Sequence, residues 1–219
     1  MRPFIKKITH PFLKLGLKLY YFKPRKYCYK QICIDVHPDV FPPHLTLSTK
    51  ILLDFIQPLE LQAKTFLELG CGTGIISLLA SSKQAMVTAT DINETALEFL
   101  QKNAIKNKLQ ATVLYSDLFE QLKGQSFDFI IINPPYYPKA PKSIKEQAWF
   151  CGENFEYFEA LFKQLPNFLG QENQTFMILS EDCKIDEIKK IAFKNGLHFI
   201  SVLEKKVAQE KNYIFRLNK

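Results

Sequence analysis

The sequence predicts an α/β fold with a doubly wound, mostly parallel seven-stranded sheet of Rossmann-like type and an antiparallel last strand. From residue 64 onward, short apolar segments alternate with amphipathic ones. Such alternation is typical of a parallel sheet with helices on both faces. The first apolar segment runs into a glycine-rich turn, as is common where a strand meets a helix near a ligand. The last two apolar segments are joined by a short turn without a helix, which makes them antiparallel neighbours.

The individual elements follow from apolar periodicity and from helix start and stop signals. The segments expected to be strands are 64–69, 85–91, 111–117, 127–132, 174–180, 197–204 and 211–218. The segments expected to be helices are 44–57, 74–82, 93–107, 154–170 and 184–195. Asn93 is the expected cap of the third helix, and Gly196 ends the last one. Residues 10–22 fit a short amphipathic helix or a strand equally well.

The charge of the chain is unevenly distributed. The net charge is +7, but residues 1–30 hold nine basic residues and no acid, so the remainder carries −2. We therefore divide the chain into a basic, aromatic-rich N-terminal arm, residues 1–35, and a near-neutral main domain, residues 36–219, which holds the motifs described below. A basic arm attracts phosphates, either of RNA or of another anionic surface. A solvated basic leader explains the same charge without a ligand.

Composition argues against several other classes of protein. No run of about 18 apolar residues is present, so we expect no membrane span. The histidines form no cluster with ligand spacing, so we expect no metal site. The five cysteines are scattered and argue against a disulfide framework, which fits a reducing cytoplasm. These cysteines are Cys28, Cys33, Cys71, Cys151 and Cys183.

A glycine-rich loop and three acids lie at successive expected strand ends. The loop, "LELGCGTG", places glycines at 70, 72 and 74, where the absence of Cβ atoms permits a sharp turn and close approach of a ligand. Asp91 could accept hydrogen bonds from both hydroxyls of a ribose, and Asp117 from an adenine edge. Glu68 could hold an α-amino group or a bridging water. Asp is also a common cap and turn residue, which is the alternative reading of each acid taken alone.

The fourth expected strand ends abruptly in "NPPY", Asn133 to Tyr136. An amide or aromatic NH2 is a poor nucleophile because its lone pair is delocalised, and two acceptors would hold its hydrogens. The Asn133 side-chain oxygen and the Pro134 carbonyl are two such acceptors, and proline brings no competing N–H. Pro134 and Pro135 stiffen the turn, and Tyr136 offers a flat face for stacking. The alternative is a proline-rich strand end above a core tyrosine.

Together these motifs resemble the class I S-adenosylmethionine-dependent methyltransferases, with "LELGCGTG", "TDIN" and "SDLF" each at a strand end. The resemblance implies S-adenosylmethionine as the cofactor. The cofactor-binding residues that it implies are Glu68, Gly70, Gly72, Gly74, Asp91, Ile92, Asp117, Leu118 and Asn133. The acceptor would be held by Asn133, Pro134, Pro135 and Tyr136, with Asn133, Pro134 and Tyr136 as the catalytic set.

The motif "NPPY" in this place is similar to that of amino-group methyltransferases, which include the HemK-type enzymes and many adenine methyltransferases. "VFPPHLTLSTKILLDF" and Trp149, Gly152 and Asn154 resemble the short branch of the HemK-type family, over roughly residues 36–218. In the first of these segments the threonine that usually has an acidic neighbour is Thr49, which here follows Ser48. The basic arm, residues 1–35, has no counterpart in that family. The resemblance implies a release-factor-like protein substrate methylated on a glutamine amide, and possible dependence on a small activator subunit.

Two other functions stay open at this point. One is methylation of an adenine or guanine amino group in structured rRNA or tRNA, favoured by the arm and by Lys139, Lys142 and Lys145 in the loop after the motif. The other is a cofactor-binding module that no longer catalyses and binds RNA. The two intact acceptors of the motif argue against the second, because a binding module does not need them.

Overall fold

The computed structural model describes residues 23–44, 46–207 and 209–219. Its strands are β1 (Arg25–Tyr29), β2 (Ile32–Val36), β3 (Thr65–Leu69), β4 (Met86–Asp91), β5 (Thr112–Tyr115), β6 (Phe129–Ile132), β7 (Gln174–Ser180), β8 (His198–Val207) and β9 (Glu210–Asn218). Its helices are α2 (Leu47–Ile56), α3 (Ile75–Ser82), α4 (Glu94–Asn107), α5 (Ile144–Gln147), α6 (Glu156–Gln164) and α7 (Ile185–Lys194), with 3₁₀ turns η1 (Glu120–Leu122) and η2 (Leu165–Phe168). The element proposed for residues 10–22 lies outside the described residues.

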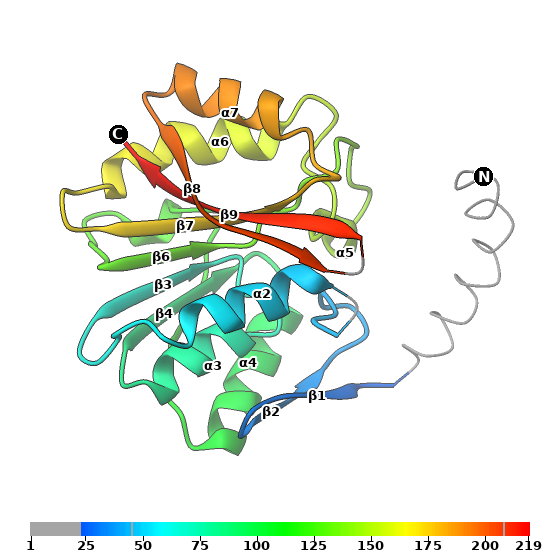
Figure 1. Ribbon diagram of the computed structural model, residues 1–219. Coiled ribbons are helices and arrows are strands. Elements are labelled where there is room, and N and C mark those ends of the chain that lie inside the picture. Colours follow the sequence, from blue (N-terminus) through cyan, green and yellow to red (C-terminus); the bar gives the residue numbers. More distant parts are fainter. Residues whose placement is uncertain (1–22, 45, 208) are drawn as a thin grey trace, which may run out of the picture.

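The predicted sheet is confirmed, with strand order β5-β4-β3-β6-β7-β9-β8. The pairs from β5 to β7 are parallel, and β9 is antiparallel to both of its neighbours, β7 and β8. In Figure 1 the helices α2, α3 and α4 cover one face of the sheet, and α6 and α7 cover the other. From β3 the chain adds strands towards one edge of the sheet, and from β6 it adds them towards the other. Ligands of open α/β sheets bind at this point, where the strand order reverses.

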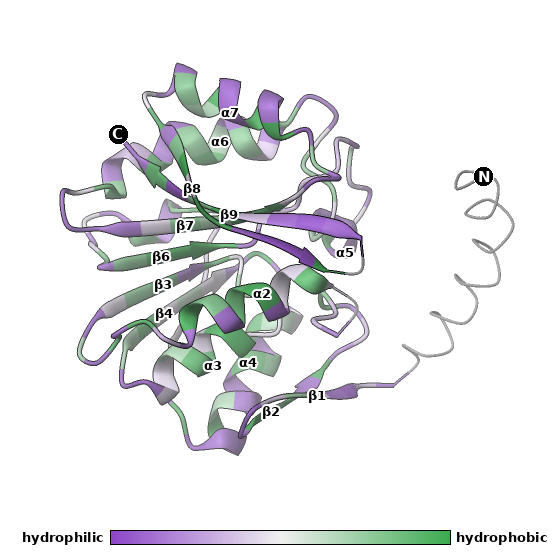
Figure 2. Ribbon diagram, viewed as in Figure 1, coloured by the Kyte–Doolittle hydropathy of each residue, from purple (hydrophilic) through white to green (hydrophobic). Residues whose placement is uncertain are grey.

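Strand β6 packs against the helices on both faces of the sheet. All four of its residues are buried, and Figure 2 shows the strand as hydrophobic along its length. Phe129 and Ile131 join the core under α2, α3 and α4, whereas Ile130 and Ile132 join the core under α6 and α7. This alternation buries a continuous apolar run on both faces of a parallel sheet. The result is a rigid central strand whose carboxyl end carries the motif that begins with Asn133.

The β1–β2 hairpin was not predicted, and it packs against the domain. Ile32, Ile34 and Val36 of β2 are buried in the same core as α2, α3 and α4. The expected boundary at residue 35 therefore lies within β2, and the division of the chain there stays a prediction. The hairpin also carries a Cys28–Cys33 disulfide. The expectation of no disulfide was wrong for this pair, because the hairpin register places the two cysteines directly opposite each other.

Helix α4 holds the hairpin through side-chain amides. The Asn103 amide donates to the Asp35 carbonyl at 3.0 Å, and the Asp35 N–H donates to the Asn103 Oδ1 at 2.8 Å. Asn107 makes the corresponding pair with Cys33, at 2.9 and 3.1 Å. Asn103 and Asn107, one helical turn apart, thus bond the backbone N–H and C=O groups of β2 as a neighbouring strand would.

Replacing Asn103 by Leu is expected to lower the free energy of unfolding by about 2–4 kcal/mol, because the half-buried N–H and carbonyl of Asp35 both lose their partners. Asn103 is only 1% exposed, and leucine would fill the same space, which leaves little room for water to replace the lost bonds. Urea unfolding measures this change, and Gln101→Leu on the exposed side of α4 is the control. Equal stability of the two variants would show that the amide pair does not hold the hairpin.

Candidate active site

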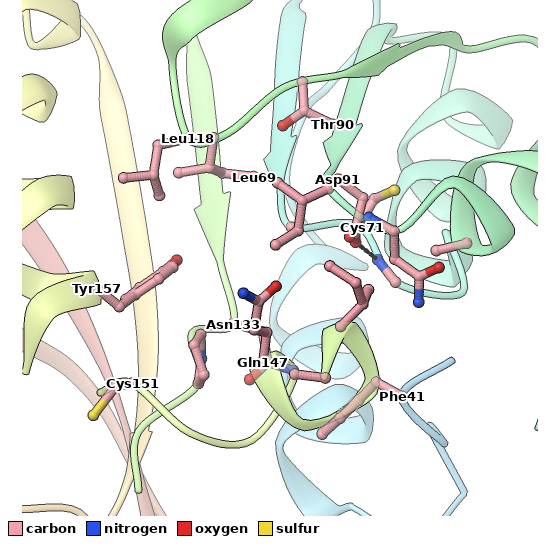
Figure 3. A pocket seen from close by; sticks show the side chains of 18 of the residues that line it. Phe41, Leu69, Cys71, Thr90, Asp91, Leu118, Asn133, Gln147, Cys151 and Tyr157 are labelled. Carbon is pink, nitrogen blue, oxygen red and sulfur yellow. Dashed lines mark hydrogen bonds between the residues drawn. The ribbon is translucent and has the colours of Figure 1, made fainter. Parts of the chain in front are cut away.

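A cavity of about 580 Å³ lies at the carboxyl ends of β3, β4, β5 and β6. Its walls come from the glycine loop, the residues that follow the strands, the segment 140–153 with α5, the first turn of α6, and Val40 and Phe41. Figure 3 shows these side chains converging on one space from both layers of the fold. The cavity lies where β3 and β6 are neighbours, as expected for a doubly wound sheet.

The glycines of the loop serve two different purposes. Gly70 lines the cavity with φ +74°, and a Cβ placed on it would meet no atom within 4 Å. The backbone there faces open space that a ligand can fill. Gly74, also with positive φ, begins α3, and a Cβ there would collide with the Leu100 side chain. Gly74 does not line the cavity, so its side of the loop is fixed by packing.

Asp91 ties the glycine loop to the end of β4. Its Oδ2 accepts from the Gly72 N–H at 2.7 Å, and its Oδ1 accepts from the Asn93 N–H at 2.9 Å. Burial raises the pKa of the Asp91 carboxyl, although these hydrogen bonds favour the charged form. Each oxygen keeps a lone pair for a ligand hydroxyl. Asn93 caps α4, as predicted, by accepting from the Thr95 N–H at 3.0 Å.

Glu68 is a buried carboxyl on the floor of the cavity. It is 5% exposed, and its Oε2 accepts from both the backbone N–H and the hydroxyl of Ser77 in α3. Burial and, to a smaller extent, the nearby Asp91 carboxylate raise the pKa of Glu68 to about 8, although the Ser77 hydrogen bonds oppose the shift. The other oxygen, Oε1, makes no hydrogen bond to a described residue and is open to a cation or water.

This raised pKa predicts a pH dependence of stability. The folded protein holds a proton on Glu68 above the ordinary value of 4.5 and loses it only near pH 8. The contribution of this proton to the free energy of unfolding is therefore complete below pH 4.5 and is lost as the pH rises towards 8. Over that range the free energy of unfolding falls by at most about 1.4 kcal/mol per pH unit. Glu68→Gln mimics the neutral form and should show a flatter fall between pH 5 and 8 in urea unfolding, whereas exposed Glu60→Gln should follow the wild type. Parallel curves for wild type and Glu68→Gln would contradict the shift.

The segment after β5 contributes the third acid and an apolar wall. Asp117 lines the cavity and is exposed, two residues beyond the end of the strand. The Ser116 hydroxyl donates to the Leu118 carbonyl at 2.9 Å and holds this turn. Ile92 and Leu118 also line the cavity. Two apolar side chains and an acceptor on the cavity wall suit a planar ring that carries an amino group.

The motif after β6 divides between the cavity and the protein interior. Asn133 and Pro135 line the cavity, and the Asn133 side-chain amide makes no hydrogen bond to another described residue. Pro134 is buried behind them. Tyr136 packs on the core under α6 and α7, beside the Tyr137 ring at 4.8 Å, and burial raises its pKa.

The cavity therefore brings together most, but not all, of the predicted site residues. Those that line it are Glu68, Gly70, Gly72, Asp91, Ile92, Asp117, Leu118, Asn133 and Pro135. Gly74, Pro134 and Tyr136 are not among the lining residues. Two further lining residues carry buried atoms without a hydrogen-bond partner in the described chain, Thr90 Oγ1 and Gln147 Oε1. These two oxygens are buried in the cavity wall, so a ligand reaches them only if their side chains rotate.

The contacts that cover the cavity, between the segment before α2 and the loop that holds α5, were not predicted from the sequence. The Phe41 ring, before α2, packs against Trp149 in a tilted arrangement with centroids 4.7 Å apart, and Lys145 of α5 pairs with Asp39 at 3.0 Å. Lys139 lies over the Phe150 ring at 4.4 Å. Two of the three loop lysines are thus engaged within the protein. Contacts between segments about 100 residues apart leave no local signal in a sequence.

The described residues contain no cluster of three or more His, Cys, Asp or Glu side chains suited to a metal ion. In the same part of the chain, no helix is long and apolar enough to cross a membrane.

The chain is similar to one family model and to several known proteins, all of them methyltransferases. A family model, the methyltransferase small domain, matches residues 31–195. A Methanocaldococcus jannaschii protein, provisionally named a protein N5-glutamine methyltransferase, is 31% identical over 173 residues, which are 74% of this chain and 85% of that protein. Ribosomal RNA small subunit methyltransferase C of Haemophilus influenzae is 33% identical over 159 residues, 67% of this chain but only 47% of that enzyme. The solved E. cuniculi Mtq2–Trm112 complex, which methylates the eRF1 termination factor, aligns with a TM-score of 0.62 at 22% identity, covering 83% of this chain and 99% of that one.

Proposed function

This chain belongs to the methyltransferase small-domain family, and on that premise we propose that it methylates the side-chain amide of a glutamine in a release-factor-like protein. The observation that carries the proposal is Asn133, an unpaired amide at the end of buried strand β6 that faces the same cavity as the glycine loop. The named function of the Methanocaldococcus jannaschii relative supports a glutamine acceptor. The family is one of enzymes, so the chain is a methyltransferase and the non-catalytic alternative falls away.

The cavity fits S-adenosylmethionine. Open space at Gly70, together with the acids that line the cavity, is consistent with a polar ligand there. In this proposal Asp91 accepts from the ribose hydroxyls, Asp117 accepts from the adenine amino group, and Glu68 faces the α-ammonium. The remaining contacts are apolar or close backbone approaches, from Ile92, Leu118, Gly70 and Gly72. When bound, the cofactor supplies a methyl group on a positively charged sulfur.

The chain's own contribution to the reaction is to position the acceptor nitrogen. The Asn133 Oδ1 and the Pro134 carbonyl each accept one N–H of the acceptor amide and hold its nitrogen toward the methyl group. Neither proline offers a competing N–H at this turn, and their rings keep the carbonyl in place. Tyr136 supports the turn from the core side, and since it is not among the residues that line the cavity, stacking of its ring on the planar amide stays a prediction.

Two features of partner choice belong to the proposal. A small activator subunit is suggested by the E. cuniculi complex, since this chain shares the fold of one chain of that two-protein complex. A release-factor substrate would also place the reaction in the cytoplasm. The second candidate function is methylation of an amino group in RNA, favoured by the ribosomal RNA enzyme of Haemophilus influenzae and by the basic residues of the arm.

The experiment that tests the proposal uses tritiated S-adenosylmethionine with the pure protein. A release-factor protein carrying Gly-Gly-Gln, ribosomal RNA and tRNA are offered side by side, and Asn133→Ala is the negative control. Label mapped by mass spectrometry to a glutamine supports the proposal. Label in RNA alone would overturn it in favour of the second candidate. If no acceptor is labelled, the assay is repeated with the activator subunit present, and failure there would also overturn it.

A further inference from the structure

Tyr157 lies in the first turn of α6 and lines the cavity. Its backbone N–H donates to the Cys151 carbonyl at 3.0 Å, which anchors the turn. Its ring packs edge-on against Phe158, with centroids 5.3 Å apart, and rests on the core under α6 and α7. These contacts fix the direction of the side chain, and Figure 3 shows its hydroxyl pointing into the cavity, which Leu118 also lines.

The hydroxyl has no hydrogen bond to any residue in the described part of the chain. A tyrosine hydroxyl in a mostly enclosed site normally finds a partner, and otherwise it costs stability. The ring position is supported by packing alone, so the oxygen is not needed to hold α6 in place. An unpaired hydroxyl on a cavity wall is therefore available to a ligand.

The charges around Tyr157 decide what it can offer. Burial, and then the carboxylates of Asp91 and Asp117, raise the pKa of this tyrosine, so the hydroxyl stays protonated at physiological pH. Asp91 and Asp117 are only acceptors when ionised. An adenine presents amino hydrogens that suit such carboxylates, but its ring nitrogens are acceptors that need a donor. Tyr157 adds a side-chain donor to this end of the cavity.

We propose that Tyr157 is a further cofactor-binding residue, whose hydroxyl donates a hydrogen bond to a ring nitrogen of the adenine of S-adenosylmethionine. This inference rests on the proposed function, because it takes the same cavity as the cofactor site. It adds a contact from the layer of α6 to those made by the loops after β4 and β5. The adenine would then be held from both sides of the sheet.

The test is calorimetric titration of S-adenosylhomocysteine into wild type, Tyr157→Phe and the control Tyr115→Phe. Tyr115 is an exposed tyrosine on β5 outside the cavity. Tyr157→Phe is expected to raise the dissociation constant about 5- to 10-fold, as for loss of one hydrogen bond, with Tyr115→Phe unchanged. The melting temperature of ligand-free Tyr157→Phe should equal that of the wild type, because no bond within the protein is lost.

Analogues identify the atom that is contacted. Either the 1-deaza or the 3-deaza analogue of S-adenosylhomocysteine should bind the wild type more weakly by a similar factor, and should bind Tyr157→Phe with no additional loss. Binding of S-adenosylhomocysteine to Tyr157→Phe within twofold of wild type would overturn the inference, as would an equal loss for every analogue. Failure of the wild type to bind S-adenosylhomocysteine at all would instead contradict the proposed function.

Discussion

Asn133→Ala is expected to lower the rate of methyl transfer by about 10²–10³-fold, the range for removing one preorganised polar group from a transition state. The side-chain oxygen is one of two acceptors proposed for the nitrogen that attacks, and alanine offers none. Because Asn133 makes no hydrogen bond to another described residue, its loss should leave the fold and the free energy of unfolding unchanged. The measurement is single-turnover transfer of label to the acceptor, with the affinity for S-adenosylhomocysteine determined in parallel.

Two variants make this result specific. Asn133→Asp keeps an acceptor oxygen and should retain more activity than Asn133→Ala. Asn195→Ala, at the end of α7, makes the same chemical change far from the cavity and should leave the rate unchanged. Transfer by Asn133→Ala within a few-fold of wild type would show that the amide does not hold the acceptor.

The parts of this fold that were predicted are those set by local pattern. Strand β6 is an unbroken apolar run, and Asn93 stands directly before an amphipathic stretch, so both could be identified from neighbouring residues. The site acids were found for a related reason, because carboxyl ends of parallel strands meet at one edge of a sheet. Helix α6 is shorter than expected, since Pro166 lacks an N–H and turns the chain into η2.

The parts that were missed depend on long-range contacts. The β1–β2 hairpin is held by amide pairs from Asn103 and Asn107, residues about 70 positions away in the chain, and asparagine on a helix gives no sign of such a role. Gly74 could not be told from Gly70 by sequence, because one glycine makes room for Leu100 and the other for a ligand. Tyr157 was read only as part of a helix, since the direction of its hydroxyl depends on packing.

Asp91→Ala is expected to weaken binding of S-adenosylhomocysteine by about 1.5–3 kcal/mol, or roughly 10- to 150-fold, as for losing charged hydrogen bonds to the ribose. The same carboxylate accepts from the Gly72 and Asn93 N–H groups, so the variant should also lose some stability without ligand. Calorimetric titration gives the first effect and urea unfolding the second. Exposed Asp186→Ala, at the start of α7, is the control for both.

The two roles of Asp91 can be separated with a modified ligand. S-adenosylhomocysteine carrying 2′-deoxyribose lacks one of the hydroxyls that Asp91 is proposed to bind. It should bind the wild type more weakly than the parent ligand, whereas Asp91→Ala should bind the two about equally, because the missing contact has already been removed. If Asp91→Ala still distinguishes the two ligands as the wild type does, the carboxylate acts only by holding Gly72 and the ribose assignment is wrong. If the distinction disappears, Asp91 both shapes the glycine loop and contacts the ligand that the loop admits.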